Sequence, residues 1–402
     1  MNILFVTWDG PQTSYLEGLF LPIFKALKSK NIHFHILQFT WGDTASIEAR
    51  RIACQNAGCS YEVVKVIRKP VALGSLASAI QGSKHITRVI KQQKIDVVMP
   101  RSTLPALSSL LALRNRSEYL VFDADGLPLD ERIDVSGQSS SGLVYRLLRD
   151  IEAQAVRRAD IVLTRSTKAT NILLARAGAQ TSSNKFYVVT NGRDTNVYTV
   201  GSVESRAATR ASLGLADNIP LLVYAGSIGP QYCLDEMLKL FELILVKNST
   251  ARLLILTGSP DLVYQALQSR AELMKLVIVK SVATKEVPTY LACADLGLAF
   301  RQPTFSMQGV APIKLGEYLL CGLPVVATKG IGDTHVISNE VGYLVEDMSG
   351  IELQRVADWF IADVLPARTQ MREQCRHVGV EYFSLEACAQ SYYRALATVI
   401  QD

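Results

Sequence analysis

Short apolar, β-branched runs alternate with segments of helical periodicity from one end of the sequence to the other. Such runs are typical of strands buried on both faces, and the alternation is typical of parallel sheets covered by helices. A first series of strands is predicted at 2–7, 33–39, 62–66, 96–99, 119–123, 161–164 and 186–189. A second series is predicted at 221–225, 253–256, 277–279, 296–300 and 324–327. The pattern therefore predicts an α/β protein with two parallel sheets in tandem.

The length of 402 residues suits two domains, each with its own core. Residues 198–218 lose apolar periodicity and are predicted to form a surface connector. With 49% hydrophobic residues the chain is globular rather than disordered. Its 42 Lys and Arg are interspersed with 37 Asp and Glu, so nucleic acid is not an expected partner.

Seven scattered cysteines without a Cys-x-x-Cys pair indicate reduced, buried thiols and no metal site. No secretory signal and no apolar run long enough to span a membrane is visible, so we expect a cytoplasmic protein. Lys84, Arg88 and Lys91 recur at helical spacing, with Lys94 nearby. This basic helix could lie on the inner face of a membrane, although a solvated charged face is the commoner explanation.

The loops that follow the strands are the expected ligand-binding segments, because open parallel sheets bind ligands at the carboxyl ends of their strands. After the first strand, Gly10 would let a ligand approach the backbone, and Ser14 with Glu17 matches a capping box. No Gly-x-Gly-x-x-Gly follows, so the dinucleotide fingerprint is absent. A binding loop and an ordinary turn are both open here. After residue 225, Gly226, Ser227 and Gly229 suit a backbone cradle for phosphate, with a tight turn as the alternative.

The strongest signal lies between residues 300 and 327. A strand ends at Arg301, and a loop leads to a helix predicted to begin near Pro312. Lys314 stands in the first turn, where the helix dipole disfavours a cation unless an anion also binds there. A diphosphate would supply that anion, and Glu317 could accept hydrogen bonds from sugar or ribose hydroxyls. The alternative, that both are solvated helix residues, leaves the misplaced cation unexplained.

This segment resembles the nucleotide-sugar signature of retaining GT-B glycosyltransferases of family 4, in the branch that reads Pro-x-Lys-Leu-x-Glu-Tyr-Leu and then Gly-Leu-Pro-Val. Other segments resemble the family in the same order: 159–166, 189–195, 224–227, 290–298, 330–333 and 381–384. The resemblance covers residues 159–402 well and the earlier residues weakly. It implies a GT-B fold of two facing Rossmann-like domains, with a terminal helix that crosses back to the first domain.

The resemblance also implies roles for single residues. Glu317 would bind the ribose of the donor, and the backbone of Gly309, Val310 and Ala311 would hold its sugar or phosphate. Ser281 and Val282 would border the base, while Gly226 and Ser227 would approach the phosphates.

Two positions depart from the family. Gly309 stands where many members have a second glutamate, and the cations that usually grip the diphosphate after residue 226 are missing. We expect Lys314 and Arg301 to take over that electrostatic role.

Asp123 and Asp125 form an Asp-x-Asp pattern after a strand of the first domain. Such a pair chelates a metal diphosphate in another glycosyltransferase fold, but binding of an acceptor hydroxyl fits this location better. A structural turn is as good an explanation.

Together these observations predict an acceptor-binding domain at 1–199, a nucleotide-sugar domain at 200–383 and a returning helix at 384–402. The expected activity is metal-independent, retaining transfer of a sugar from a nucleotide diphosphate sugar to a glycan or lipid-linked glycan, as in surface polysaccharide synthesis. The donor is a substrate, and no cofactor is expected. The alternatives are a sugar-nucleotide epimerase of the same fold and a noncatalytic sugar-nucleotide-binding protein.

Overall fold

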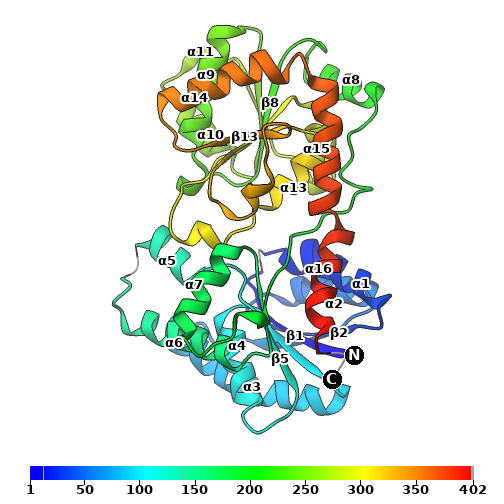
Figure 1. The fold of residues 1–402 in the computed structure, drawn as a ribbon, viewed down its shortest axis with the longest axis vertical. Coiled ribbons are helices and arrows are strands. Elements are labelled where there is room, and N and C mark those ends of the chain that lie inside the picture. Colours follow the sequence, from blue (N-terminus) through cyan, green and yellow to red (C-terminus); the bar gives the residue numbers. More distant parts are fainter. Residues whose placement is uncertain (12, 138, 400–402) are drawn as a thin grey trace. The chain divides into compact units, whose positions relative to one another are not determined.

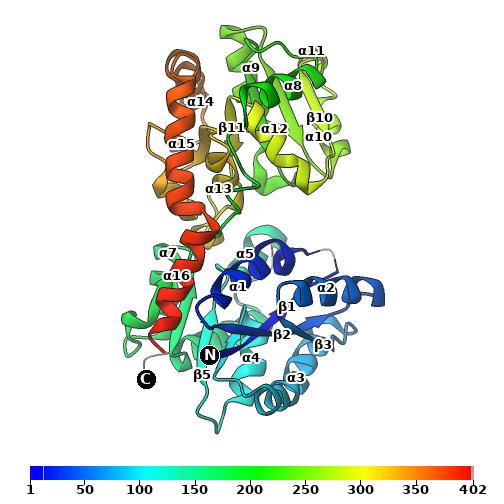
Figure 2. The same cartoon turned by 90° about the vertical axis from the view of Figure 1, so that its right-hand side faces the viewer.

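The computed structural model of the chain describes residues 1–11, 13–137 and 139–399. They form two compact units, each with one sheet (Figures 1 and 2). Unit 1 comprises residues 1–191, 308–310 and the chain from Cys388 onward, and unit 2 comprises 192–307 and 311–387. The units change after residue 191, eight residues before the predicted boundary at 199/200, and after residue 387, four residues after the one at 383/384; residues 308–310, predicted to lie in the second domain, group with unit 1. Residues 400–402 of the predicted terminal segment lie outside the described residues.

The sheet of unit 1 has the order β3-β2-β1-β4-β5-β6-β7 and is parallel throughout. The bounds of its strands are β1 Asn2–Trp8, β2 His33–Thr40, β3 Ser60–Lys65, β4 Val97–Pro100, β5 Tyr119–Asp123, β6 Ile161–Thr164 and β7 Phe186–Val188. Central strands such as β4 and β6 are buried at every position, so helices must cover both faces. The order of connection reverses between β1 and β4, and the carboxyl ends of these two strands are therefore a position at which such sheets bind ligands.

The helices of unit 1 are α1 Leu21–Lys28, α2 Thr44–Asn56, α3 Val71–Gln93, α4 Thr103–Ala112, α5 Pro128–Ser136, α6 Leu143–Arg158, α7 Thr167–Ala177 and most of α16 Leu385–Ala397, with a π-helical turn at Leu16–Phe20. The predicted capping box is wrong. The turn begins after Tyr15, whose side chain makes no capping hydrogen bond. Glu17 instead accepts a hydrogen bond of 2.9 Å from Nε of the buried Arg50, because the guanidinium attracts its carboxylate more strongly than a backbone amide does.

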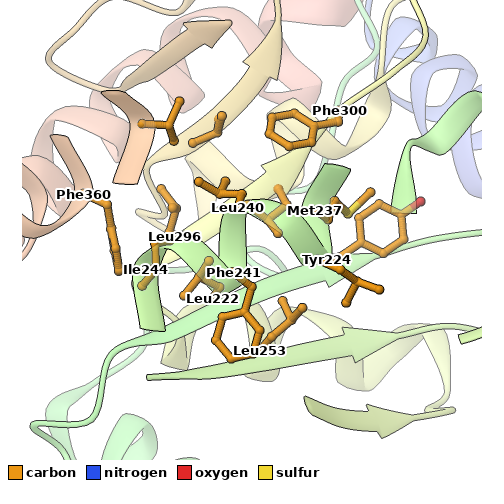
Figure 3. Packing of buried hydrophobic residues seen from close by; sticks show 14 of the residues in the cluster. Leu222, Tyr224, Met237, Leu240, Phe241, Ile244, Leu253, Leu296, Phe300 and Phe360 are labelled. Atoms are coloured by element: carbon orange, nitrogen blue, oxygen red, sulfur yellow. The ribbon is translucent and has the colours of Figure 1, made fainter. Parts of the chain in front are cut away.

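The sheet of unit 2 has the order β10-β9-β8-β11-β12-β13. Its strands are β8 Leu221–Ala225, β9 Arg252–Leu256, β10 Val277–Lys280, β11 Leu296–Ala299, β12 Val325–Thr328 and β13 Gly342–Val345. Its helices are α8 Val203–Ser212, α9 Leu234–Lys247, α10 Pro260–Leu267, α11 Ala271–Met274, α12 Val287–Cys293, α13 Ile313–Leu320, α14 Gly350–Trp359 and α15 Arg368–Phe383. Figure 3 shows side chains of β8 and β9 packed against the apolar face of α9. The predicted α/β architecture with two parallel Rossmann-like sheets is confirmed.

The segment predicted as a surface connector contains a helix, α8, and this prediction is wrong. Arg210 of α8 is fully buried, donates a 2.8 Å hydrogen bond to the Cys293 carbonyl and lies 3.6 Å from the buried Asp295. Asp295 also pairs with Arg206 and Arg368. The helix is thus anchored by charges rather than by an apolar stripe. Because it lacks an apolar stripe, the sequence pattern did not predict it.

Two observations concern membranes. Among the residues that the structure describes, no helix combines the length and the apolar composition needed to span a bilayer. The basic residues Lys84, Arg88 and Lys91 lie on α3, and Arg88 pairs with Glu62. Contact of this helix with a membrane stays a prediction.

Candidate functional site

A cavity of about 270 Å³ opens in unit 2 at the carboxyl ends of neighbouring strands. Its lining residues come from the ends of β8 and β9, from the segments that follow β8, β9 and β10, from α13 and from Tyr198: Tyr198, Ala225, Gly226, Ser227, Leu256, Thr257, Gly258, Val282, Thr284, Val287 and Glu317. The strand order reverses between β8 and β11, directly beside this cavity. That is the position at which open α/β sheets bind nucleotides.

Lys314 lies next to the cavity in an unusual environment. It is the second residue of α13, and its side chain is buried at 8% exposure. Its Nζ has no hydrogen-bond partner among the described residues and lies 4.0 Å from the centroid of the Tyr224 ring. Burial first, and then repulsion from Arg301, lower the pKa of Lys314 to about 7, against the attraction of Glu317. A solvated helix residue is therefore ruled out for Lys314.

Arg301 brings a second cation to the same place. Its guanidinium lies 4.8 Å from the centroid of the Tyr232 ring, and Lys314 Nζ lies 5.3 Å from the same ring. Arg301 donates to the Met307 sulfur, but its buried Nε has no partner in the part of the chain that the structure describes. Two cations thus share one aromatic ring without a carboxylate between them, an arrangement that favours an anion.

Gly226 connects the cations to the cavity. It lines the cavity, and its φ of +148° is one that side chains rarely adopt. A Cβ at this position would lie 3.1 Å from Lys314 Nζ, so any other residue would crowd the ammonium as well as strain the backbone. The backbone of Gly226 and Ser227 and the lysine therefore border one small volume.

Glu317 is held in place by two residues of the segment that connects β7 to α8. Its Oε1 accepts hydrogen bonds of 3.0 Å from Arg193 Nε and from the Tyr198 hydroxyl. Burial and the charge of Glu317 raise the pKa of Tyr198, so its hydroxyl remains a donor. Because Glu317 lines the cavity, a fixed carboxylate faces the space where a ligand would lie.

Of the other residues predicted to contact the donor, some lie at the cavity of unit 2 and others do not. Val282 lines the cavity, whereas the neighbouring Ser281 is exposed and does not. Ala311 is buried in unit 2, but Gly309 and Val310 group with unit 1. Ser166 donates to the Gln308 carbonyl in that unit, and a Cβ on Gly309 would lie 2.8 Å from Leu127. The donor contacts of Gly309, Val310 and Ser281 stay predictions.

The two aspartates of unit 1 differ sharply. Asp123 is fully buried, and its oxygens accept hydrogen bonds from Arg165 and from the backbone of Asp125. This enclosure gives Asp123 a structural role rather than contact with an acceptor. The Asp125 side chain is 30% exposed, lines a second cavity and lies 2.6 Å from Arg101. No three His, Cys, Asp or Glu side chains gather as metal ligands anywhere in the described ranges.

Gly10 also lines that second cavity, in unit 1. A Cβ on Gly10 would lie 2.8 Å from the Trp41 ring, so the close approach that needs glycine is that of Trp41.

Sequence reasoning missed four residues of the site in unit 2: Tyr224, Tyr232, Arg193 and Tyr198. The first two flank the glycine-rich turn at residues 226–229, and only their position near it could have indicated them.

Comparisons with known proteins agree with this geometry. Residues 219–362, most of unit 2, match the family of glycosyl transferases group 1. A D-inositol 3-phosphate glycosyltransferase of Rhodococcus jostii is 27% identical over 223 residues, which are 52% of this chain and 45% of the relative. A chitobiosyldiphosphodolichol beta-mannosyltransferase of Candida albicans is 29% identical over 114 residues, or 27% of this chain and 25% of the relative. The matched parts thus span half or less of these relatives.

The fold is shared with solved structures over nearly the whole chain. The structure of Anabaena HepE in complex with UDP-glucose superposes with a TM-score of 0.72 at 18% identity and covers 99% of this chain and 100% of that one. WaaG, a glycosyltransferase involved in lipopolysaccharide biosynthesis, superposes with a TM-score of 0.69 at 17% identity, covering 98% of each chain. The chain therefore has the fold of GT-B glycosyltransferases.

Proposed function

We propose that this protein is a retaining glycosyltransferase that moves a sugar from a nucleotide diphosphate sugar to a glycan or lipid-linked glycan, without a metal ion. The match of residues 219–362 to glycosyl transferases group 1 supports the reaction class. The neighbouring HepE structure, which holds UDP-glucose, supports a nucleotide sugar as the donor.

The observation that carries the proposal is the buried ammonium of Lys314. A lysine without a hydrogen-bond partner at 8% exposure is unfavourable in the ligand-free protein. Arg301 increases the penalty, because it adds a second positive charge, and no carboxylate of the described residues forms an ion pair with it. A diphosphate bound beside Gly226 would neutralise both cations and accept hydrogen bonds from the backbone at the start of α13.

The same groups would promote the reaction. As the bond between the sugar and the diphosphate breaks, negative charge grows on the leaving diphosphate. Lys314 and Arg301 are fixed by packing on Tyr224 and Tyr232, so they can stabilise this charge without reorganisation. Two protein cations supply here the charge that a divalent metal supplies in other transferases.

Recognition of the nucleoside would depend on the remaining walls of the cavity. The carboxylate of Glu317, oriented by Arg193 and Tyr198, is placed to accept hydrogen bonds from the ribose hydroxyls. Val282 and Val287, which follow β10, offer an apolar surface to the base. These contacts would orient the donor before the diphosphate is engaged.

A donor panel with two variants tests the proposal. UDP-glucose, GDP-mannose and related nucleotide sugars are screened by thermal shift, and turnover is followed by release of the nucleoside diphosphate. We expect Lys314→Ala to lower turnover roughly a hundredfold, as loss of one stabilising group does at other transition states. Glu317→Gln should weaken donor binding about tenfold, because a charged hydrogen-bond acceptor is lost.

Lys275→Ala serves as the matched control, since Lys275 is an exposed lysine of the same unit, paired with Glu272. If both site variants behave like this control, the placement of the donor site is wrong. Tight donor binding without transfer or hydrolysis would instead favour a noncatalytic nucleotide-sugar-binding protein.

A further inference from the structure

Unit 1 holds a cavity of about 1000 Å³, much larger than the cavity of about 270 Å³ in unit 2. It lies at the carboxyl ends of β1, β4 and β5, with Trp8, Arg101 and Asp125 among its lining residues. The N-terminal turns of α3, α5 and α6 complete its walls. A volume of this size accommodates a ligand of drug-like dimensions or larger.

One part of the wall is apolar and continues to the surface. Val71 and Leu76 of α3 line the cavity, as do Val144 and Leu148 of α6. Val71 is 58% exposed and Val144 is 49% exposed, and Leu143 beside it is 83% exposed. Aliphatic side chains at this density beside a cavity mark a binding surface rather than scattered surface residues.

Trp41 adds a rigid aromatic surface to this wall. Its ring rests against Gly10, where a Cβ would come within 2.8 Å, and the Arg68 guanidinium lies 4.2 Å from the ring centroid. The ring is thus held in position before any ligand arrives. Preorganised aromatic surface of this kind binds ligands at a low entropic penalty.

The same cavity carries positive charge that the protein does not neutralise. Arg68 and Arg132 line it, are exposed, and have no acidic side chain within ion-pair distance among the described residues. Asp125 is the one acidic residue of the lining, and it already lies 2.6 Å from Arg101. The cavity therefore combines an apolar wall with an anion-binding mouth.

We propose that this cavity binds the acceptor, and that the acceptor is a lipid phosphate: a hydrocarbon chain attached to a phosphate group that carries the hydroxyl or glycan to be extended. This assignment rests on the proposed function. A polar glycan would leave the aliphatic wall of α3 and α6 without a partner, and a neutral lipid would leave Arg68 and Arg132 without one. Asp125 lies in the same cavity, where its carboxylate can accept a hydrogen bond from the acceptor hydroxyl.

Binding of farnesyl phosphate to the full chain tests this inference. The measurement is quenching of Trp8 and Trp41 fluorescence in saturating UDP-glucose, which keeps the phosphate probe out of the cavity of unit 2. We expect farnesyl phosphate to bind at least tenfold more tightly than farnesol or inorganic phosphate, because each of these lacks one half of the recognised chemistry. Binding of farnesol or of inorganic phosphate as tightly as farnesyl phosphate would overturn the inference.

Two variants locate the binding. Arg68→Ala combined with Arg132→Ala should weaken farnesyl phosphate binding about tenfold or more and affect farnesol binding far less, because farnesol carries no phosphate. Val144→Asp should weaken both, because it places a carboxylate on the apolar wall. The controls are Lys84→Ala with Lys91→Ala, elsewhere on α3 and outside the cavity lining, and Val246→Asp, at an 86% exposed position of unit 2. Variants that bind like their controls would overturn the assignment.

UDP-glucose affinity, measured on the same proteins, separates this inference from the proposed function. If UDP-glucose binds normally while farnesyl phosphate does not bind, the lipid-phosphate acceptor is wrong and the transferase proposal stands. If no nucleotide sugar binds at all, the proposed function fails first.

Discussion

Replacement of Lys314 by methionine is expected to stabilise the ligand-free protein while it weakens donor binding. The pKa of Lys314 falls from its ordinary value of 10.5 to about 7, so folding works against the charged form. Methionine has a similar length, and its thioether packs well against aromatic rings such as those of Tyr224 and Tyr232. The variant therefore removes the buried charge and retains most of the packing.

The expected magnitude follows from the difference between the pKa of Lys314 in the unfolded chain and in the folded chain. A difference of one in pKa corresponds to about 1.4 kcal/mol, so the charged lysine destabilises the fold by about 4 kcal/mol at pH 7. Between pH 7 and pH 10.5 the unfolded chain binds more protons at this site than the folded chain does. The stability of the natural protein thus rises with pH across this window, and the advantage of methionine falls to about 2 kcal/mol at pH 9.

Urea denaturation at pH 6, 7 and 9 measures this difference. The two units can unfold separately, so the transition of unit 2 must be observed on its own. Trp359 lies in unit 2, whereas Trp8 and Trp41 lie in unit 1. Fluorescence in a background with Trp8→Phe and Trp41→Phe therefore reports the unit that contains Lys314. Lys275→Met, at an exposed lysine, should change stability by less than about 0.5 kcal/mol.

Two results would refute this reasoning. Lower stability of Lys314→Met at pH 7 would mean that the ammonium is satisfied in the ligand-free protein. A stability difference that stays constant from pH 6 to pH 9 would mean that the pKa of Lys314 is not depressed.

Three further predictions concern unit 2. The affinity for UDP-glucose, whose diphosphate carries no titrating terminal group, should fall as pH rises above 7, because the neutral lysine must then take up a proton on binding. Titration calorimetry measures the affinity of the natural protein and of Lys314→Met at several pH values. An affinity that changes with pH equally in the two proteins would contradict this prediction. Gly226→Ala should weaken UDP-glucose binding about tenfold through strain at a φ of +148°, whereas Gly350→Ala, with open space around its Cβ, should not, as titration calorimetry can show. Asp295→Ala should lower the free energy of unfolding of unit 2, measured in urea, by about 3–5 kcal/mol, because Arg206, Arg210 and Arg368 lose their buried partner. A decrease as small as that caused by Glu272→Ala, at an exposed position, would disprove the role given to this cluster.

Much of the fold could be predicted because parallel strands leave an unambiguous apolar pattern. The predicted strands of both series lie within two residues of those observed. The edge strand β13, Gly342–Val345, was missed because four residues that begin with glycine carry no such pattern. The helix α8 was missed for another reason: its buried anchor, Arg210, is a charged residue that periodicity treats as exposed.

The candidate site was predictable in part for a similar reason. Lys314 stood out because a cation at the start of a helix conflicts with the helix dipole, and the conflict is local in sequence. The rings of Tyr224 and Tyr232, and the two donors to Glu317, reach the site from positions that no sequence pattern links to it. Loop conformations depend on tertiary packing and leave no periodic signal, so these partners appear only in the structure.

The half-charged state of Lys314 has a calorimetric consequence. With a pKa of about 7, about half of the ligand-free molecules carry the ammonium charge at neutral pH, and a bound diphosphate would hold it charged in all of them. Each binding event then withdraws about half a proton from the buffer. The apparent binding enthalpies measured in Tris and in Hepes will therefore differ by about half of the difference between the ionisation enthalpies of the two buffers. This difference is expected even if the dissociation constants measured in the two buffers agree.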